Sequence, residues 1–267
     1  MRIRCLFLFA SLAFAAAALA AGAEETPVLP GHPGKDVIWV PTPPALVEKM
    51  LDMAKVGPGD FLMDLGSGDG RIVIAAARRG VPALGVEYTP ELVQMARRNA
   101  AEAGVSTLAT FVQGDMFEAD LSKATVFCLF LLPVNLQKLE PKFAAMPPGT
   151  RIVNNGYKIP GWQEAETGVA GDCGAWCTAY LYYVPAHVAG KWRFPAGEMT
   201  LEQDFETITG TFASSLGTQR VEGKVRGDRI DLLAGLDEFR GRVSGATMRG
   251  EASGARGGYW QATREQP

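Results

Sequence analysis

The sequence predicts an α/β fold, a doubly wound parallel sheet covered by helices, with a small antiparallel β domain after it. Two observations support this prediction. Short apolar runs alternate with stretches of helical periodicity up to Pro185, whereas single polar and apolar residues alternate after about Ala186. The expected organisation is an export signal over residues 1–23, a linker over 24–36, the α/β domain over 37–185 and the β domain over 186–267.

Composition argues against several classes of protein. The chain has 267 residues, of which 47% are hydrophobic and 21% charged, as in globular proteins with a substantial core. Its formal net charge of −3, with basic residues dispersed along the chain, argues against a nucleic-acid partner. His32 and His187 have no cluster of acids or cysteines beside them, so we expect neither a metal site nor a histidine-based triad.

The first 23 residues have the pattern of an export signal. Arg2 and Arg4 precede an uncharged run rich in Leu, Phe and Ala, which ends in small residues suited to cleavage. An uncleaved membrane anchor is the alternative, because the run just reaches spanning length. With the arginines on the cytoplasmic side, we expect a periplasmic or secreted protein, or one held at the inner membrane by its N-terminal segment.

The α/β domain is expected to begin with a helix. After the proline- and glycine-rich linker over 24–36, Thr42 and Pro43 offer a helix cap and a first-turn proline ahead of an apolar stripe. Phe61–Leu65 is then a short apolar run typical of a strand, and a glycine loop leads to helical spacing over Ile72–Arg79. This strand, loop and helix form the first unit of the predicted sheet.

The same pattern continues along the chain. A helix starting with Thr89 as cap and Pro90 in its first turn extends to Ala103, and a further helix is expected over Leu136–Ala145. The strands that alternate with these helices are Ala83–Glu87, Ala109–Val112, Thr125–Leu132 and Arg151–Asn154. Such alternation builds a parallel sheet, and ligands of these sheets bind at the carboxyl ends of the strands.

The C-terminal part contains an internal repeat. Val221–Gly227 is echoed 18 residues later by Phe239–Gly245, and each copy alternates apolar with polar residues before a glycine turn. The repeated unit is one hairpin. It predicts a small β meander that is able to close into a barrel.

The cysteines leave one question open. In an oxidising compartment Cys173 and Cys177 could form a disulfide, but their spacing is equally compatible with two free thiols in a loop. They fall short of the four ligands of a structural zinc site. Cys128 lies in an apolar run and is expected to be a buried thiol.

A glycine loop, Asp64–Gly70, carries the strongest chemical signal. It follows the first predicted strand, where glycines let the backbone approach a ligand and the next helix points N–H groups outward. The spacing of its glycines differs from the dinucleotide fingerprint, and Asp64 at its head would repel a pyrophosphate. The loop suits a ligand with a cationic amino-acid group.

Two further carboxylates follow the next two predicted strands. Glu87, at the tip of the second strand, is placed to accept both hydroxyls of a ribose. Gly114–Met116 follows the third strand and offers the Asp115 carboxylate to an adenine amino group, with an apolar wall for the ring. Together with Asp64 they predict a site for an adenosyl ligand that carries an amino-acid group.

With these motifs the chain resembles the class I, seven-strand S-adenosylmethionine-dependent methyltransferases from about Asp36 to Pro185. More narrowly, it resembles the small lysine methyltransferases of mitochondria and bacteria that modify membrane carrier and ATP synthase subunits. The resemblance implies a Rossmann-like sheet, S-adenosylmethionine as cofactor, and a protein lysine or small amine as acceptor. An export signal and a β appendage set this chain apart from those relatives. The stretches that match are Val40–Pro43, Asp64–Ala77, Leu132–Pro133, Leu136–Leu139 and Ile159–Trp162.

The loop, the strand tips and the resemblance together define the expected site. The cofactor-binding residues are Thr42, Asp64, Gly66, Ser67, Gly68, Gly70, Glu87, Tyr88, Gly114, Asp115 and Met116. The resemblance places Pro133 and Asn135 beside the acceptor, and Trp39, Tyr157 and Trp162 are candidates to line a slot that keeps a lysine neutral. Helix capping is an alternative role for Thr42 and Asn135, and core packing for Trp162.

No catalytic residue is assigned, because methyl transfer by direct displacement depends mainly on alignment and exclusion of water. Two other functions stay open. One is an exported, non-catalytic module that binds an adenosyl ligand, because the cofactor is made in the cytoplasm. The other is a nicotinamide-dependent oxidoreductase, which Asp64 and the glycine spacing disfavour.

Overall fold

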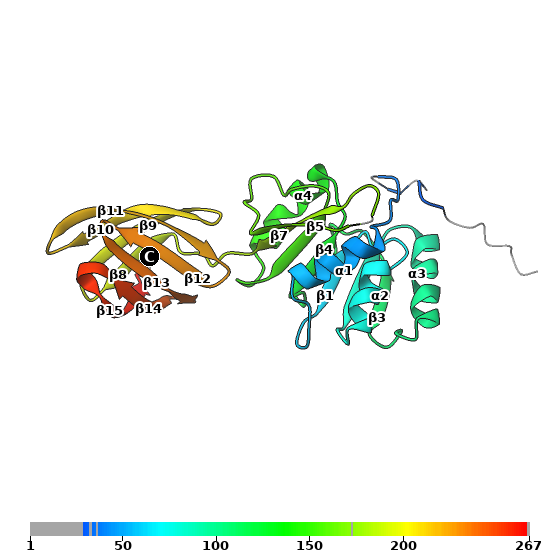
Figure 1. Ribbon diagram of the computed structural model, residues 1–267, viewed down its shortest axis with the longest axis horizontal. Coiled ribbons are helices and arrows are strands. Elements are labelled where there is room, and N and C mark those ends of the chain that lie inside the picture. Colours follow the sequence, from blue (N-terminus) through cyan, green and yellow to red (C-terminus); the bar gives the residue numbers. More distant parts are fainter. Residues whose placement is uncertain (1–28, 32–33, 36, 172, 266–267) are drawn as a thin grey trace, which may run out of the picture.

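The computed structural model describes residues 29–31, 34–35, 37–171 and 173–265, and these residues form two parts that lie end to end (Figure 1). One part is a seven-stranded sheet covered by helices, and the other is a closed β-barrel. This architecture confirms the predicted fold class. The expected export signal over residues 1–23 lies outside the described residues.

The sheet has the strand order β3-β2-β1-β4-β5-β7-β6. The first five strands in this order are parallel, whereas β7 pairs antiparallel with both β5 and β6. The sheet is therefore mixed, and its last two strands are an addition to the predicted parallel strands. The strands are β1 (Leu62–Leu65), β2 (Ala83–Glu87), β3 (Ala109–Gln113), β4 (Val126–Leu129), β5 (Arg151–Asn155), β6 (Glu166–Val169) and β7 (Thr178–Tyr183).

Helices cover both faces of the sheet. Buried side chains of the first three helices share one hydrophobic cluster with the sheet, and Leu136, Leu139 and Phe143 share a second cluster with the opposite face. The helices are α1 (Pro44–Met53), α2 (Arg71–Arg78), α3 (Pro90–Glu102) and α4 (Pro133–Ala144). Strand β1 lies between β2 and β4, so the chain crosses over at its carboxyl end, where doubly wound sheets bind ligands.

The start of α1 corrects one local prediction. Pro43, not Thr42, is the N-cap residue of this helix. The Thr42 side chain is buried, and its hydroxyl accepts a hydrogen bond from Asn155 Nδ2 at 3.4 Å. Thr42 therefore ties the segment before α1 to the end of β5.

The C-terminal part is a closed barrel of eight antiparallel strands, and its closure extends the predicted meander. The two copies of the sequence repeat lie in β11 and β13, on either side of β12. Pairing of β15 with β8 closes the ring, and aromatic side chains such as Trp192, Phe212 and Phe239 fill its interior. The strands are β8 (Gly190–Phe194), β9 (Gly197–Asp204), β10 (Thr207–Ser214), β11 (Gly217–Arg226), β12 (Arg229–Ala234), β13 (Asp237–Ser244), β14 (Thr247–Ser253) and β15 (Gly258–Arg264).

The barrel contacts the sheet through a small junction. The ring of Trp162, which follows β5, stacks on Phe205 in the β9–β10 turn with 4.1 Å between ring centroids. Its indole N–H donates to Glu140 Oε1 of α4 at 3.3 Å. The Ala186 N–H donates to the Gly227 carbonyl at 2.7 Å. One end of the barrel is thus attached beside α4, at a distance in the chain from the glycine loop.

Candidate active site

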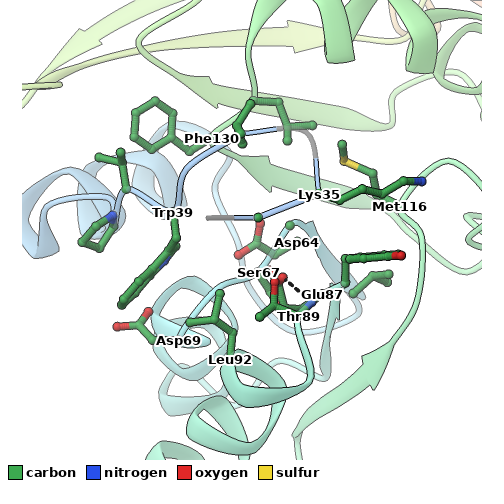
Figure 2. Close-up of a pocket in the computed structure, with 18 of the residues that line it drawn as sticks. Lys35, Trp39, Asp64, Ser67, Asp69, Glu87, Thr89, Leu92, Met116 and Phe130 are labelled. Carbon is green, nitrogen blue, oxygen red and sulfur yellow. Dashed lines mark hydrogen bonds between the residues drawn. The ribbon is translucent and has the colours of Figure 1, made fainter. Parts of the chain in front are cut away.

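A cavity lies at the carboxyl ends of the parallel strands (Figure 2). Every described residue that lines it falls between Gly34 and Asn135. The walls come from the segment before α1, the glycine loop after β1, the tip of β2, the loop after β3 and the segment between β4 and α4. The predicted strand-tip residues therefore gather around one space.

The glycine loop lies close to the indole of Trp39. Gly68 has a φ of 53°, and a Cβ atom there would lie 2.3 Å from Trp39 Nε1. At Gly70, with a φ of 80°, a Cβ atom would lie 2.6 Å from the ring of Phe111. Both positions need glycine, because an L side chain is strained at positive φ and would collide with these rings. The exposed backbone of the loop can then approach a ligand.

Glu87 is fixed by the backbone on either side of it. Its Oε2 accepts the Gly68 N–H at 2.9 Å, and its Oε1 accepts the Thr89 N–H at 2.9 Å. The side chain is buried, at 8% exposure, and lines the cavity. A carboxylate has about four lone-pair positions, so two acceptor positions are left for a ligand after these two bonds. This arrangement suits a ribose, which offers two neighbouring hydroxyls.

Asp64 is a buried carboxylate in the wall of the cavity, with an exposed fraction of 3%. Burial raises its pKa well above the usual value, and the nearby charges of Glu87 and Asp69 add to the effect. A cationic ligand group would offset this penalty. The site therefore favours a ligand whose positive charge lies beside Asp64.

Asp115 forms the opposite wall. It pairs with Lys35 at 2.5 Å and accepts the Phe117 N–H at 2.9 Å. The hydrogen bond from Lys35 lowers the pKa of this carboxyl group, and the backbone hydrogen bond acts in the same direction. The Lys35 ammonium also lies 5.2 Å from the centre of the Tyr88 ring. The last part of the predicted linker thus contributes to the cavity.

Two buried polar atoms on the cavity wall have no hydrogen-bond partner within the described part of the chain. They are Ser67 Oγ and Asn135 Nδ2. Buried polar groups are normally paired, so two such atoms facing one cavity indicate a polar ligand. With Asp64 and Glu87, they fit an adenosyl ligand with an amino-acid group.

The structure brings most of the predicted site residues together. The cofactor residues Thr42, Asp64, Gly66, Ser67, Glu87, Tyr88, Gly114, Asp115 and Met116 line the cavity, as do Trp39 and Asn135 from the acceptor set. Gly68 and Gly70 shape the loop without lining the cavity. Pro133 begins α4, Tyr157 packs on Trp176, and Trp162 lies at the barrel junction. Lys35 and Phe130 line the cavity without having been predicted, because no sequence motif marks them.

Other kinds of site find little support. In the described ranges, His, Cys, Asp and Glu side chains form no group suited to hold a metal ion. None of the described helices has the length and apolar character needed to cross a membrane.

Known proteins match the part of the chain that builds the cavity. The sequence profile of the ANTKMT methyltransferase domain matches residues 64–166. A protein-lysine N-methyltransferase of Saccharolobus islandicus is 41% identical over 57% of this chain and 96% of its own length. An ATP synthase lysine N-methyltransferase of Mus musculus is 31% identical over 68% of this chain and 71% of its own length.

A solved structure is similar as well. The crystal structure of an RNA methyltransferase from Salinibacter ruber, in complex with S-adenosyl-L-homocysteine, has 46% sequence identity and a TM-score of 0.53. The match covers 56% of this chain and 96% of that chain. The match to the ANTKMT methyltransferase domain ends at residue 166, so the barrel, which begins at Gly190, lies outside that domain.

Proposed function

Because this chain belongs to the S-adenosylmethionine-dependent protein-lysine N-methyltransferases, we propose that its cavity binds S-adenosylmethionine through the three strand-tip carboxylates. Asp64 would face the amino-acid part, Glu87 the ribose hydroxyls and Asp115 the adenine amino group. The observation that carries this assignment is the buried Asp64 carboxylate in the cavity wall, whose raised pKa a cationic ligand would offset. Family membership favours a methyltransferase over a nicotinamide-dependent oxidoreductase.

The protein contributes binding and alignment. When bound, S-adenosylmethionine supplies an activated methyl group that passes to a nucleophile by direct displacement. The backbone bonds from Gly68 and Thr89 hold the Glu87 carboxylate in one position, so the ribose is oriented before reaction. The apolar wall formed by Leu92, Met116 and Leu131 excludes water from part of the cavity.

The proposed acceptor is the ε-amine of a lysine in another protein. Such an amine must lose its proton before it can act as a nucleophile, and an environment poor in water favours the neutral form. Asn135, at the start of α4, borders the end of the cavity where the acceptor would enter. We place the reaction outside the cytoplasm, in the periplasm, in the secreted protein or at the inner membrane, on the pattern of residues 1–23.

Two measurements test this function. Isothermal titration of the purified chain should detect binding of S-adenosylhomocysteine and none of NADH. Incubation with S-adenosylmethionine carrying a tritiated methyl group, and with a protein extract, should label lysines that mass spectrometry identifies. An extract of RNA provides the second arm, because the similar Salinibacter ruber protein is an RNA methyltransferase. Labelling of RNA alone would overturn the lysine assignment and keep the cofactor assignment. Binding without any transfer would favour the non-catalytic module.

A further inference from the structure

Three aromatic rings lie next to the cavity, on the side where β4 ends. Phe130 lines the cavity itself and follows β4 directly. The ring of Trp176 lies 5.5 Å from the ring of Phe130 and 5.4 Å from the ring of Tyr157, between centroids. The three residues come from the segments after β4, after β5 and before β7. They form a continuous aromatic surface that leads away from Phe130.

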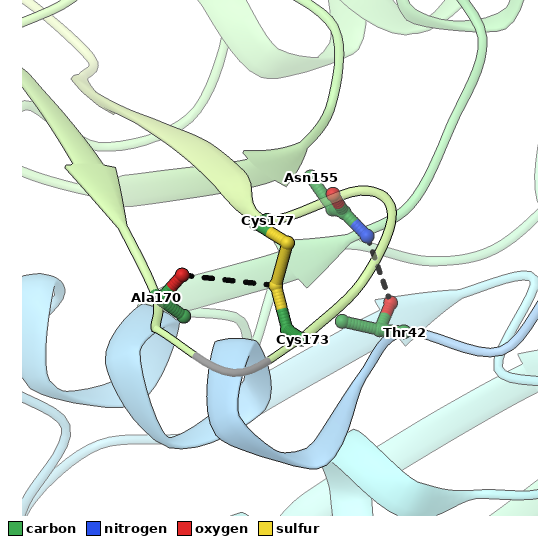
Figure 3. Close-up of a disulfide and its surroundings, with 5 residues drawn as sticks. All are labelled: Thr42, Asn155, Ala170, Cys173 and Cys177. Carbon is green, nitrogen blue, oxygen red and sulfur yellow. Dashed lines mark hydrogen bonds between the residues drawn. A yellow bond between two sulfur atoms is a disulfide. The ribbon is translucent and has the colours of Figure 1, made fainter.

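The loop that presents Trp176 is held in place covalently. Cys173 and Cys177 form a disulfide, which answers the question left open by their spacing (Figure 3). Trp176, one residue before Cys177, has a φ of 61°, which is uncommon for a residue other than glycine. Its neighbour Gly156 leaves room for the indole, because a Cβ atom there would lie 2.9 Å from the ring. Backbone and disulfide together fix Trp176 against the end of β5.

The backbone on both sides of the loop is also anchored. The Gly156 N–H donates to the Thr178 carbonyl at 2.8 Å, and the Ala170 N–H donates to the Cys177 carbonyl at 2.9 Å. Asn155, beside this loop, donates to Thr42 in the cavity wall. The loop is thus connected to the cavity through the end of β5.

The exposure of Trp176 argues against a purely structural role. Its exposed fraction is 41%, although an indole that serves only as packing is normally covered. A fixed, exposed aromatic surface at the mouth of a cavity suits a long aliphatic chain that ends in a cation. Such a chain packs its methylene groups on the rings, and its ammonium is attracted to their faces.

We infer that Phe130, Tyr157 and Trp176 form the entrance for the acceptor lysine, and that the Cys173–Cys177 disulfide positions Trp176 there. Trp176 is a specificity-determining residue in this scheme, and the disulfide has a positioning role. The inference rests on the proposed function, because it assumes that the cavity holds the cofactor and that lysine is the acceptor.

A bisubstrate analogue tests the entrance without a known acceptor. The probe joins the S-adenosylhomocysteine skeleton to a lysine side chain at the position of the transferred methyl group. Its affinity and that of S-adenosylhomocysteine are measured by titration for the wild type, Trp176→Ala, Trp176→Phe and the double variant Cys173→Ser with Cys177→Ser. Tyr259→Ala is the matched control, because this exposed aromatic residue lies on the barrel.

The wild type should bind the analogue more tightly than S-adenosylhomocysteine. Trp176→Ala should lose roughly 2- to 30-fold of the affinity for the analogue, the range of a cation–π contact, and keep its affinity for S-adenosylhomocysteine. Trp176→Phe should recover part of the loss. The double serine variant should weaken the analogue alone, and a phosphine reductant should weaken it for the wild type without a further effect on that variant.

The outcomes separate the two proposals. No gain of the analogue over S-adenosylhomocysteine in the wild type would contradict lysine as the acceptor. A gain that Trp176→Ala retains in full would overturn the aromatic entrance while the proposed function stands. A double serine variant that binds the analogue like the wild type would overturn the positioning role of the disulfide. Equal losses of both ligands would show that the loop only supports the fold of the cavity.

Discussion

Replacement of Glu87 by glutamine tests the centre of the proposed cofactor site. The two carboxylate oxygens each accept one backbone N–H at 2.9 Å and keep one further acceptor position for a ribose hydroxyl. In Glu87→Gln the amide nitrogen can only donate, so one backbone N–H and one ribose hydroxyl lose their acceptor. The shape of the side chain is kept, and the change therefore isolates the hydrogen bonds.

The expected loss follows from the charge of the acceptor. A hydrogen bond to a charged group contributes about 1.5–3 kcal/mol, so the affinity for S-adenosylhomocysteine should fall roughly 10- to 150-fold. The unpaired backbone N–H should also lower the free energy of unfolding by about 1–3 kcal/mol. Isothermal titration measures the first effect, and chemical denaturation measures the second.

Glu166→Gln is the matched control for this variant. Glu166 is exposed in β6 of the same sheet, so its replacement removes the same charge without touching the cavity. Both measured quantities should stay close to those of the wild type. Unchanged affinity of Glu87→Gln for S-adenosylhomocysteine would refute the ribose assignment, whatever its stability.

Three further predictions concern other parts of the chain. Because folding raises the pKa of Asp64, its carboxyl group lowers the free energy of unfolding as pH rises from the usual aspartate range toward the raised pKa. Asp64→Asn should therefore melt higher than the wild type at pH 8, match it at low pH and bind S-adenosylhomocysteine more weakly; a lower melting temperature at pH 8 would contradict the burial argument. In the barrel, Arg256→Met leaves the buried Asp237 carboxylate unpaired and should cost about 3–5 kcal/mol of barrel stability in urea, with S-adenosylhomocysteine affinity unchanged, whereas Arg240→Met at an exposed pair should have little effect. Mass spectrometry of a periplasmic extract should find a mature terminus near Ala21 or Glu24, and intact Met1 on cytoplasmic protein would argue against export.

The sequence by itself was sufficient for the features that depend on local order. Asp64, Glu87 and Asp115 follow successive strands, and parallel strands bring their carboxyl ends to one edge, so the cavity was predictable without coordinates. The β2 strand has the predicted bounds for the same reason, because its apolar run is bounded by clear turn residues. The repeat in the C-terminal part likewise encoded its hairpins.

The tertiary structure decided the features that depend on contacts between distant segments. Lys35 reaches Asp115 across 80 positions, and a linker-like composition gives no sign of that ion pair. Strand β7 runs antiparallel to β5, and its direction is set by pairing in space. Trp162 is drawn to the barrel junction by Phe205, which belongs to a different part of the chain. Periodicity indicates which side of an element is apolar, but the neighbour that covers it is chosen only when the whole chain packs.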